Sequence, residues 1–160
     1  MKSNHYTHSL YYKLLIGYLI FGLLGFITIA TISSEMTYHH LVERESEVLY
    51  DEATMIADRC SKAYEGKTIN LDSAYPQIEA VSAYLQSDIW ILNHEGTIVA
   101  DSSDSRTGIA IDDFDPTAQG NRLYSIGQYY NLFDSKVLSV SAPITGNMKT
   151  YGYIVIHMPI

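Results

Sequence analysis

The chain contains 160 residues, of which 47% are hydrophobic, and it carries a formal net charge of −8 at pH 7. An acidic chain of this kind lacks the basic footprint that phosphate backbones require, so we expect no nucleic-acid partner. Its single cysteine, Cys60, excludes a disulfide within the chain.

Residues 14–34 form one apolar stretch of 21 residues without Asp, Glu, Lys or Arg. A helix of that length spans about 30 Å, the thickness of a bilayer hydrocarbon core. The alternative is a cleaved signal peptide, whose apolar core is normally about 7–15 residues and precedes a small-residue cleavage site. This stretch is longer and no convincing cleavage site follows. The sequence therefore predicts a transmembrane helix that contacts membrane lipid.

The charges on the two sides of this stretch differ in sign. Residues 1–13 carry two lysines and no acidic residue, whereas all 18 Asp and Glu residues follow the stretch together with eight Lys and Arg. The positive-inside rule then predicts a cytoplasmic tail at 1–13, a transmembrane helix at 14–34 and an extracytoplasmic domain at 35–160. We accordingly expect the chain to reside in the cell membrane.

Residues 35–65 are predicted to continue as one long helix, because they contain neither Pro nor Gly. Apolar or small residues recur there with a period of about 3.6. This stripe can face either the domain of the same chain or a second copy of the helix. We expect a parallel homodimer through the long helix, partly through Leu41, Val48, Leu49, Ile56 and Cys60. For Cys60 itself, a buried core position and an interchain disulfide are the two alternatives.

The remaining residues predict an α+β domain. A second helix is expected at 73–86, with Pro76 in its first turn. From residue 88 the hydrophobic period changes to two, and strands are predicted at 88–93, 97–101, 123–126, 136–144 and 151–158. The expected fold is an antiparallel sheet of about five strands spanning 88–158, with the helices on one face.

Two segments carry a resemblance to a known family. They are DIWILNHEGTIVADSS at 88–103 and LSVSAPITGNMKTYGYIVIHMPI at 138–160. Together with the membrane span and the long helix, they resemble the extracytoplasmic PAS-like, single Cache sensor region of bacterial sensor histidine kinases. The resemblance covers essentially the whole chain, and it implies a PAS-like fold that senses a small extracellular ligand.

The resemblance also implies a role in signalling. It implies the sensing domain of a two-component histidine kinase, which relays ligand occupancy across the membrane through the N-terminal helix. No enzymatic activity is expected in these 160 residues, because the phosphoacceptor, the kinase domain and contact with a response regulator belong to cytoplasmic segments that are not among them. The alternatives are a chemotaxis transducer, a cyclic-dinucleotide enzyme, or a membrane-anchored binding protein without signalling output.

Six polar residues are candidates for lining a cleft between the sheet and its loops: Asp101, Arg106, Tyr124, Tyr130, Ser139 and His157. Arg106 is the natural partner for a carboxylate or phosphate group; its alternatives are a solvated charge or a salt bridge to a nearby Asp. Asp101 can instead cap a turn, and His157 can be a structural histidine. Tyr124 and Tyr130, like Tyr129 nearby, can be core or rim aromatics.

The sequence predicts neither a metal nor a cofactor. Asp104, Asp112, Asp113 and Asp115 could supply oxygens to a divalent cation, but the loop spacing of an EF-hand is absent. A solvated acidic loop is the simpler interpretation. The sequence also contains no G-x-S-x-G or H-E-x-x-H motif, so hydrolase chemistry is not indicated.

Overall fold

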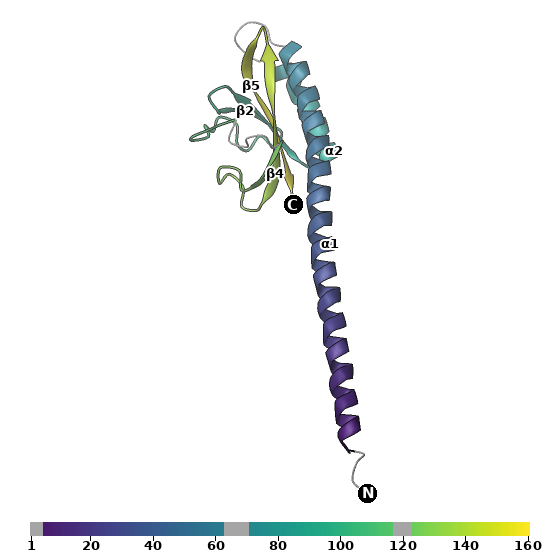
Figure 1. Ribbon diagram of the computed structural model, residues 1–160. Coiled ribbons are helices and arrows are strands. Elements are labelled where there is room, and N and C mark those ends of the chain that lie inside the picture. The colour runs from purple at the N-terminus through teal and green to yellow at the C-terminus, as the bar shows by residue number, and fades with distance from the viewer. Residues whose placement is uncertain (1–4, 63–70, 117–122) are drawn as a thin grey trace. The chain divides into compact units, whose positions relative to one another are not determined.

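The computed structural model describes residues 5–62, 71–116 and 123–160 and divides the chain into two compact units, Met1–Val42 and Glu43–Ile160. Helix α1, His5–Lys62, contributes to both units (Figure 1). Its start at His5 lies within the predicted tail. The predicted helix end at residue 65 lies outside the described residues.

The first unit is the N-terminal part of α1. By length and composition this helix is able to cross a membrane, and every side chain from Leu10 to Leu41 is exposed. The hydroxyls of Thr28 and Thr31 donate to the carbonyls of Leu24 and Ile27 at 2.8 Å. Their polar groups are therefore satisfied within the helix, as a lipid environment requires. The candidate membrane span predicted at 14–34 lies in this unit.

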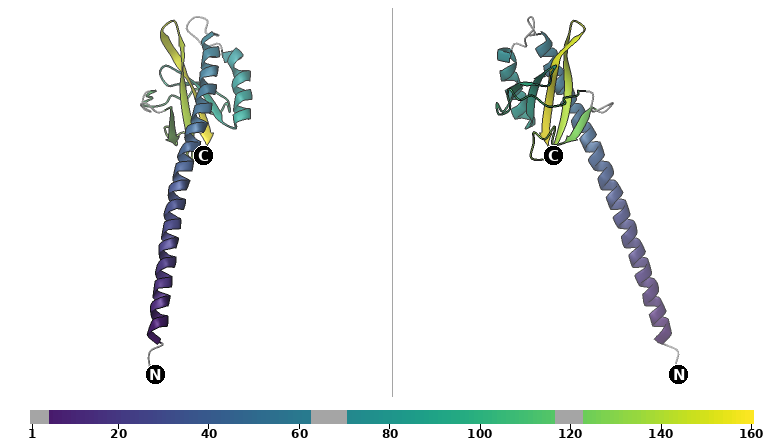
Figure 2. Two further views of the ribbon diagram at one scale, coloured as in Figure 1. Left: turned by 45° about the vertical axis from the view of Figure 1, so that its right-hand side comes forward. Right: turned by 90° about the vertical axis from the view of Figure 1, so that its left-hand side faces the viewer.

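The second unit contains the rest of α1, helix α2 (Leu71–Leu85) and one antiparallel sheet. The strands are β1 (Asp88–Asn93), β2 (Ile98–Asp101), β3 (Tyr124–Gly127), β4 (Val137–Gly146) and β5 (Lys149–Pro159). Their spatial order is β2-β1-β5-β4-β3. The helices lie together on one face of the sheet (Figure 2). The predicted α+β class and the five-stranded sheet are confirmed.

The main core of the second unit lies between the helices and the sheet face that they cover. Side chains alternate along each strand, and Ile89, Ile91, Ile154 and Ile156 are fully buried. On the helical side the buried residues are Leu49, Ala53, Ile56, Ala57, Cys60 and Ile78. Removing these apolar side chains from water stabilises the unit by about 25 cal/mol per Å² of apolar surface buried.

This packing corrects the predicted dimer stripe. Leu49, Ile56 and Cys60 are between 1% and 3% exposed, so they belong to the core of their own domain and are not available to a second chain. Leu41 and Val48 do remain exposed. Burial also raises the pKa of the Cys60 thiol to about 11, which keeps it protonated at neutral pH.

The opposite face of the sheet carries a second cluster of buried residues: Trp90, Leu92, Ile98, Ile111 and Val155. Loop side chains cover it, namely Phe114, Tyr129, Leu132 and Phe133, together with Tyr153 of β5. These loops follow β2 and β3 in the chain. A rigid sheet covered by loops is the usual arrangement for a recognition site.

The β1–β2 turn positions one of the covering rings. Gly96 has a φ of +86°, and a Cβ atom at this position would lie 2.4 Å from the Cβ atom of Phe114. The Asn93 side chain accepts hydrogen bonds from the backbone N–H groups of Glu95 and Thr97 at 3.0 and 2.8 Å. The turn therefore needs glycine for both its conformation and the close approach of Phe114.

Candidate functional site

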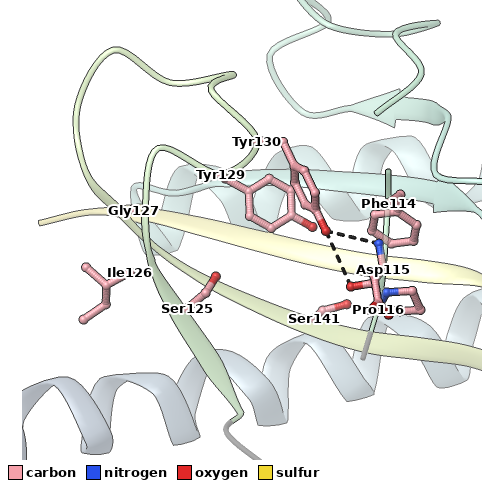
Figure 3. A pocket seen from close by; sticks show the side chains of 9 residues that line it. All are labelled: Phe114, Asp115, Pro116, Ser125, Ile126, Gly127, Tyr129, Tyr130 and Ser141. Carbon is pink, nitrogen blue, oxygen red and sulfur yellow. Dashed lines mark hydrogen bonds between the residues drawn. The ribbon is translucent and has the colours of Figure 1, made fainter. Parts of the chain in front are cut away.

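An open pocket of about 340 Å³ lies over strands β3 and β4 (Figure 3). Three aromatic rings and two serine side chains are prominent in its wall, and the lining residues are Phe114, Asp115, Pro116, Ser125, Ile126, Gly127, Tyr129, Tyr130 and Ser141. The size falls within the range of small-molecule sites, about 300–1,000 Å³. The mixture of apolar wall and a few polar groups also fits that class.

The loop after β3 forms one wall of this pocket in an unusual conformation. Tyr129, Tyr130 and Asn131 have φ values of 36°, 52° and 59°, so three consecutive non-glycine residues are left-handed. Each such residue costs roughly 1–2 kcal/mol. The turn is held by Leu132 N–H to the Tyr129 carbonyl at 3.1 Å and by Phe133 N–H to the Gln128 carbonyl at 3.2 Å.

Tyr130 ties this loop across the pocket to the segment after β2. Its hydroxyl oxygen accepts from the backbone N–H of Asp115 at 3.2 Å, and the hydroxyl lies 3.5 Å from the Asp115 carbonyl (Figure 3). The Phe114 and Tyr130 rings are 6.3 Å apart. The two loops therefore meet at one end of the pocket.

Behind Tyr129 lies a closed cluster of aromatic rings. The Trp90 ring stacks on Phe133 with centroids 5.3 Å apart and planes 8° apart. His157 meets the Trp90 ring edgewise at 4.1 Å and the Tyr129 ring at 4.4 Å. Because Tyr129 both lines the pocket and packs on His157, it is the partition between the open pocket and the closed cluster.

His157 is held as a neutral imidazole in this cluster. It is 1% exposed, and its Nδ1 atom lies 2.8 Å from the Ser139 hydroxyl oxygen. Burial, with a smaller contribution from the positive charge of Arg106, lowers the pKa of His157 to about 3. Among the described residues, neither His157 Nε2 nor the buried Trp90 Nε1 has a hydrogen-bond partner. Each such group costs about 1–3 kcal/mol when left buried and unpaired.

Arg106 lies at the edge of the same cluster. Its guanidinium carbon is 4.7 Å from the Phe133 ring centroid and 5.5 Å from that of Trp90. Nη2 donates to the Leu132 carbonyl at 3.3 Å, and Nη1 lies 3.8 Å from the Asp88 carboxylate. The ion pair is weak, because burial and the nearby Asp101 raise the pKa of Asp88 despite the opposing effect of Arg106. The side chain is 25% exposed, so Arg106 is a partly buried cation against aromatic faces.

Asp101 organises the loop that carries Arg106. Its fully buried carboxylate accepts from the backbone N–H groups of Ser103, Ser105 and Arg106 at 2.9, 3.2 and 3.0 Å. The hydroxyls of Ser103 and Ser105 donate to the same carboxylate. Asp101 therefore caps the loop and holds the backbone of Arg106 in place. These bonds occupy both carboxylate oxygens of Asp101.

The structure distributes the six candidate residues over four places. Arg106, Ser139 and His157 meet in the closed cluster, and Tyr130 lines the open pocket. Asp101 caps the loop that carries Arg106. Tyr124 starts β3 opposite Val140 and does not line the pocket.

The six candidates left out four aromatic residues of this region: Phe114, Trp90, Tyr129 and Phe133. Of these, Tyr129 was considered only as a core or rim aromatic. Trp90 looked like an ordinary core residue in a buried strand. The signal that could have found Tyr129 and Phe133 was the segment 127–134, which is rich in aromatic residues although it lies between the strands β3 and β4. Among the described residues no group of three or more His, Cys, Asp or Glu could hold a metal ion.

No protein-family model and no curated protein matches this chain. Several solved structures resemble it. The ligand-binding domain of the Campylobacter jejuni chemoreceptor Tlp3 in complex with L-norvaline has 11% identity and a TM-score of 0.47, over 81% of this chain and 59% of that one. The sensor domain of the V. cholerae histidine kinase DctB has 16% identity and a TM-score of 0.42, over 92% of this chain and 57% of that one.

A third structure is the sensory domain of the same chemoreceptor, Tlp3 (CcmL), with 12% identity and a TM-score of 0.45 over 81% of this chain and 61% of that one. The chain thus spans about three fifths of the length of the domains it matches. Each of the three is a ligand-binding, sensory or sensor domain. Likenesses of this strength assign neither a ligand nor an output to this chain.

Proposed function

We propose that residues 43–160 are the ligand-sensing domain of a transmembrane receptor and that a small molecule occupies the pocket beside Tyr129 and Tyr130. The observation that carries this proposal is the open pocket of about 340 Å³ over β3 and β4. The cluster behind its Tyr129 wall holds the partly buried Arg106 cation and two buried nitrogens that have no partner among the described residues. Convergent polar groups beside an apolar pocket are the usual basis for a binding-site assignment.

In this proposal the N-terminal part of α1 anchors the receptor. Residues 14–34 span the membrane, 1–13 lie in the cytoplasm and 35–160 lie outside. The apolar length of the helix and the charge difference between its flanks support this orientation. The domain then meets extracellular solutes, and α1 is the covalent route by which occupancy reaches the membrane.

We propose that the output of this receptor is a two-component histidine kinase, because segments 88–103 and 138–160 resemble the sensor region of such kinases. A chemotaxis transducer, a cyclic-dinucleotide enzyme and a binding protein without output are the alternatives. The coding sequence after Ile160 separates them. A second apolar span followed by a phosphoacceptor helix pair and an ATP-binding domain supports the kinase, and any other continuation contradicts it.

We also propose a parallel homodimer through a narrower stripe than the sequence suggested. Leu41, Val48 and Met55 recur at exact seven-residue spacing on α1 and are 57%, 48% and 41% exposed. Seven residues are nearly two helical turns, so the three side chains share one face. Pairing this stripe, hereafter the 41/48/55 stripe, with a second α1 removes its apolar surface from water.

A melting experiment on the full chain in detergent micelles tests the sensing function. A library of small polar molecules is screened for compounds that raise the melting temperature, and the hits are repeated on Ser141→Phe, which fills the pocket. We expect hits on the parent chain that Ser141→Phe abolishes. The matched control is Ser135→Phe, which places the same ring on an exposed loop residue outside the pocket lining. An absence of hits, or hits that Ser141→Phe leaves intact, would contradict the proposal.

A further inference from the structure

The loop at residues 128–133, which forms one wall of the pocket, also covers the positively charged side chain of Arg106. Nη2 of Arg106 donates to the Leu132 carbonyl, and the Phe133 ring of the same loop lies 4.7 Å from the guanidinium carbon. The rings of Tyr129 and Phe133 cover both Trp90 and His157. Residues 128–133 thus provide a carbonyl acceptor for Arg106, and their aromatic rings cover the side chains of Trp90 and His157.

This loop covers a set of three nitrogen-bearing groups, the Arg106 guanidinium and two buried ring nitrogens that have no hydrogen-bond partner among the described residues. The indole N–H of Trp90 can only donate, and among the described residues it has no partner. His157 Nε2 is likewise unpaired there, while its other nitrogen is engaged by Ser139. Buried polar groups are almost always satisfied in native proteins, so two unpaired nitrogens in one cluster call for an explanation.

The chemistry of this set selects a carboxylate. A guanidinium presents five N–H donors in a planar fork that matches the two oxygens of a carboxylate. Among the described residues, the Arg106 guanidinium donates to the Ser105 hydroxyl and the Leu132 carbonyl, which leaves part of that fork unused. The neighbouring anions are Asp88 at 3.8 Å and Asp101, whose carboxylate is occupied by its own loop. A ligand carboxylate would therefore compete with the Leu132 carbonyl for Arg106.

The covering loop has the features of an element that can move. Its three left-handed residues are strained, and its backbone–backbone hydrogen bonds among the described residues are local ones within 128–133. Its longer-range bonds are single ones, from Arg106 to the Leu132 carbonyl and from Asp115 to the Tyr130 hydroxyl. Tyr129 is also the wall that the open pocket and the closed cluster share. A molecule entering the pocket meets this residue first.

We propose that residues 128–133 are a displaceable lid, and that a small carboxylate entering the pocket moves Tyr129 aside and replaces the Leu132 carbonyl on Arg106. This inference rests on the proposed sensing function and names its ligand class. In the closed state described here, the lid carbonyl stands in for the ligand acceptor. The exchange of one acceptor for another gives the domain two alternative states that occupancy can bias.

Trp90 reports directly on this exchange, because it is the only tryptophan in the chain and is fully buried against the lid. Sodium formate, acetate, propionate and butyrate are titrated against the full chain in detergent micelles, with chloride holding the ionic strength constant. We expect a saturable change in Trp90 emission for at least one of them. Acetamide and propionamide, which lack the charge, should produce none.

Two variants with the same loss of charge assign the effect to Arg106. Arg106→Gln should weaken carboxylate binding at least tenfold, whereas Lys136→Gln, an exposed cation outside the cluster, should change it less than twofold. If Arg106→Gln fails to fold by circular dichroism, Arg106→Lys keeps the charge without the fork and should still weaken binding at least threefold. If the Arg106 and Lys136 variants weaken carboxylate binding equally, the carboxylate responds only to the overall charge of the domain, and the proposal is overturned.

Tyr129→Ala tests the lid itself. Removing the partition should favour the displaced state, so carboxylate binding should tighten and acrylamide should quench Trp90 more strongly. Unchanged or weaker binding in Tyr129→Ala would show that Tyr129 is a fixed contact and contradict the lid. If melting hits are abolished by Ser141→Phe while no carboxylate changes Trp90 emission, the lid and its ligand class fail and the sensing function stands.

Discussion

The Nδ1 atom of His157 on β5 lies 2.8 Å from the hydroxyl oxygen of Ser139 on β4, and the two residues are direct partners in the sheet register. Both side chains are 1% exposed. This pair places an ionisable ring on the floor of the closed cluster in its neutral form. Protonation there would put a second positive charge beside Arg106 in a buried site.

The pH dependence of stability should reveal this neutral histidine. The pKa of His157 is about 3 in the folded state, against an ordinary value near 6.5. The unfolded chain therefore binds the extra proton between these values, and the free energy of unfolding should fall as the pH drops from about 6.5 toward 3. The slope from this group is at most about 1.4 kcal/mol per pH unit.

Urea unfolding at pH 7 and pH 5 measures this effect in the parent chain and in His157→Asn. The asparagine retains a polar group for Ser139 but does not titrate, so the variant should lose less stability between the two pH values. The carboxylates contribute equally to both proteins and cancel in the comparison. An identical pH loss in the two chains would show that His157 is not held neutral.

Asp101 should be the most sensitive of the candidate residues to substitution. Its carboxylate accepts three backbone N–H groups, so Asp101→Ala leaves several donors unpaired and should cost about 2–4 kcal/mol of stability. Asp101→Asn retains one acceptor oxygen and should cost less. Urea unfolding of the full chain checks the order. A loss below about 0.5 kcal/mol for the alanine variant would contradict the capping role.

The fold was predictable because its signals are local and strong. The β1–β2 hairpin combines a strand-like apolar run with the turn at His94–Gly96, and the alternation of Tyr151, Tyr153, Val155 and His157 marks one face of β5. Period and turn chemistry define these elements regardless of what packs on them. The order of the strands and the boundaries of the helices required the structure.

The candidate site was only partly predictable, for two physical reasons. The left-handed run at Tyr129–Asn131 contradicts local preference, since non-glycine residues avoid positive φ, and it is retained by contacts such as Tyr130 with Asp115 that are distant in sequence. The apolar stripe of α1 was also ambiguous. Adjacent residues Val48 and Leu49 are both apolar, and only packing shows that Leu49 faces the sheet.

Disulfide crosslinking tests the 41/48/55 stripe. In a Cys60→Ala background, single cysteines at Val48 and Met55 should form interchain disulfides in membranes under mild oxidation. Thr54→Cys is the matched control, because it is exposed but points about 100° away from its neighbour Met55. Efficient crosslinking at Thr54 with none at Val48 and Met55 would place the interface on another face of α1.

The state of Cys60 gives an independent check on the same helix. Because its thiol is buried and its pKa is raised to about 11, the native chain should react slowly with a thiol reagent such as Ellman's reagent. We expect at least a hundredfold acceleration when the domain is unfolded in urea. No interchain disulfide should form through this residue. Rapid labelling of the folded chain would contradict its core position.

The proposed orientation in the membrane is tested by cysteine labelling in intact cells. With Cys60→Ala as background, Thr54→Cys should react with a membrane-impermeant maleimide, whereas Ser9→Cys should react only after permeabilisation. The positive charge of the first 13 residues is the reason for this expectation. Labelling of Ser9→Cys in intact cells would reverse the topology and remove the domain from contact with extracellular ligands.

The most direct test of the sensing pocket is a backbone amide NMR spectrum of the full chain. Ser125 and Ser141 line the pocket, whereas Ile89 is buried on the sheet face opposite the pocket loops. Pools of small carboxylates, amines and neutral polar molecules are added in turn. The account predicts that at least one pool shifts the Ser125 and Ser141 amide signals saturably while the Ile89 signal stays in place. Ser125 and Ser141 signals that no pool moves, or shifts that appear at Ile89 instead, would contradict ligand binding in this pocket.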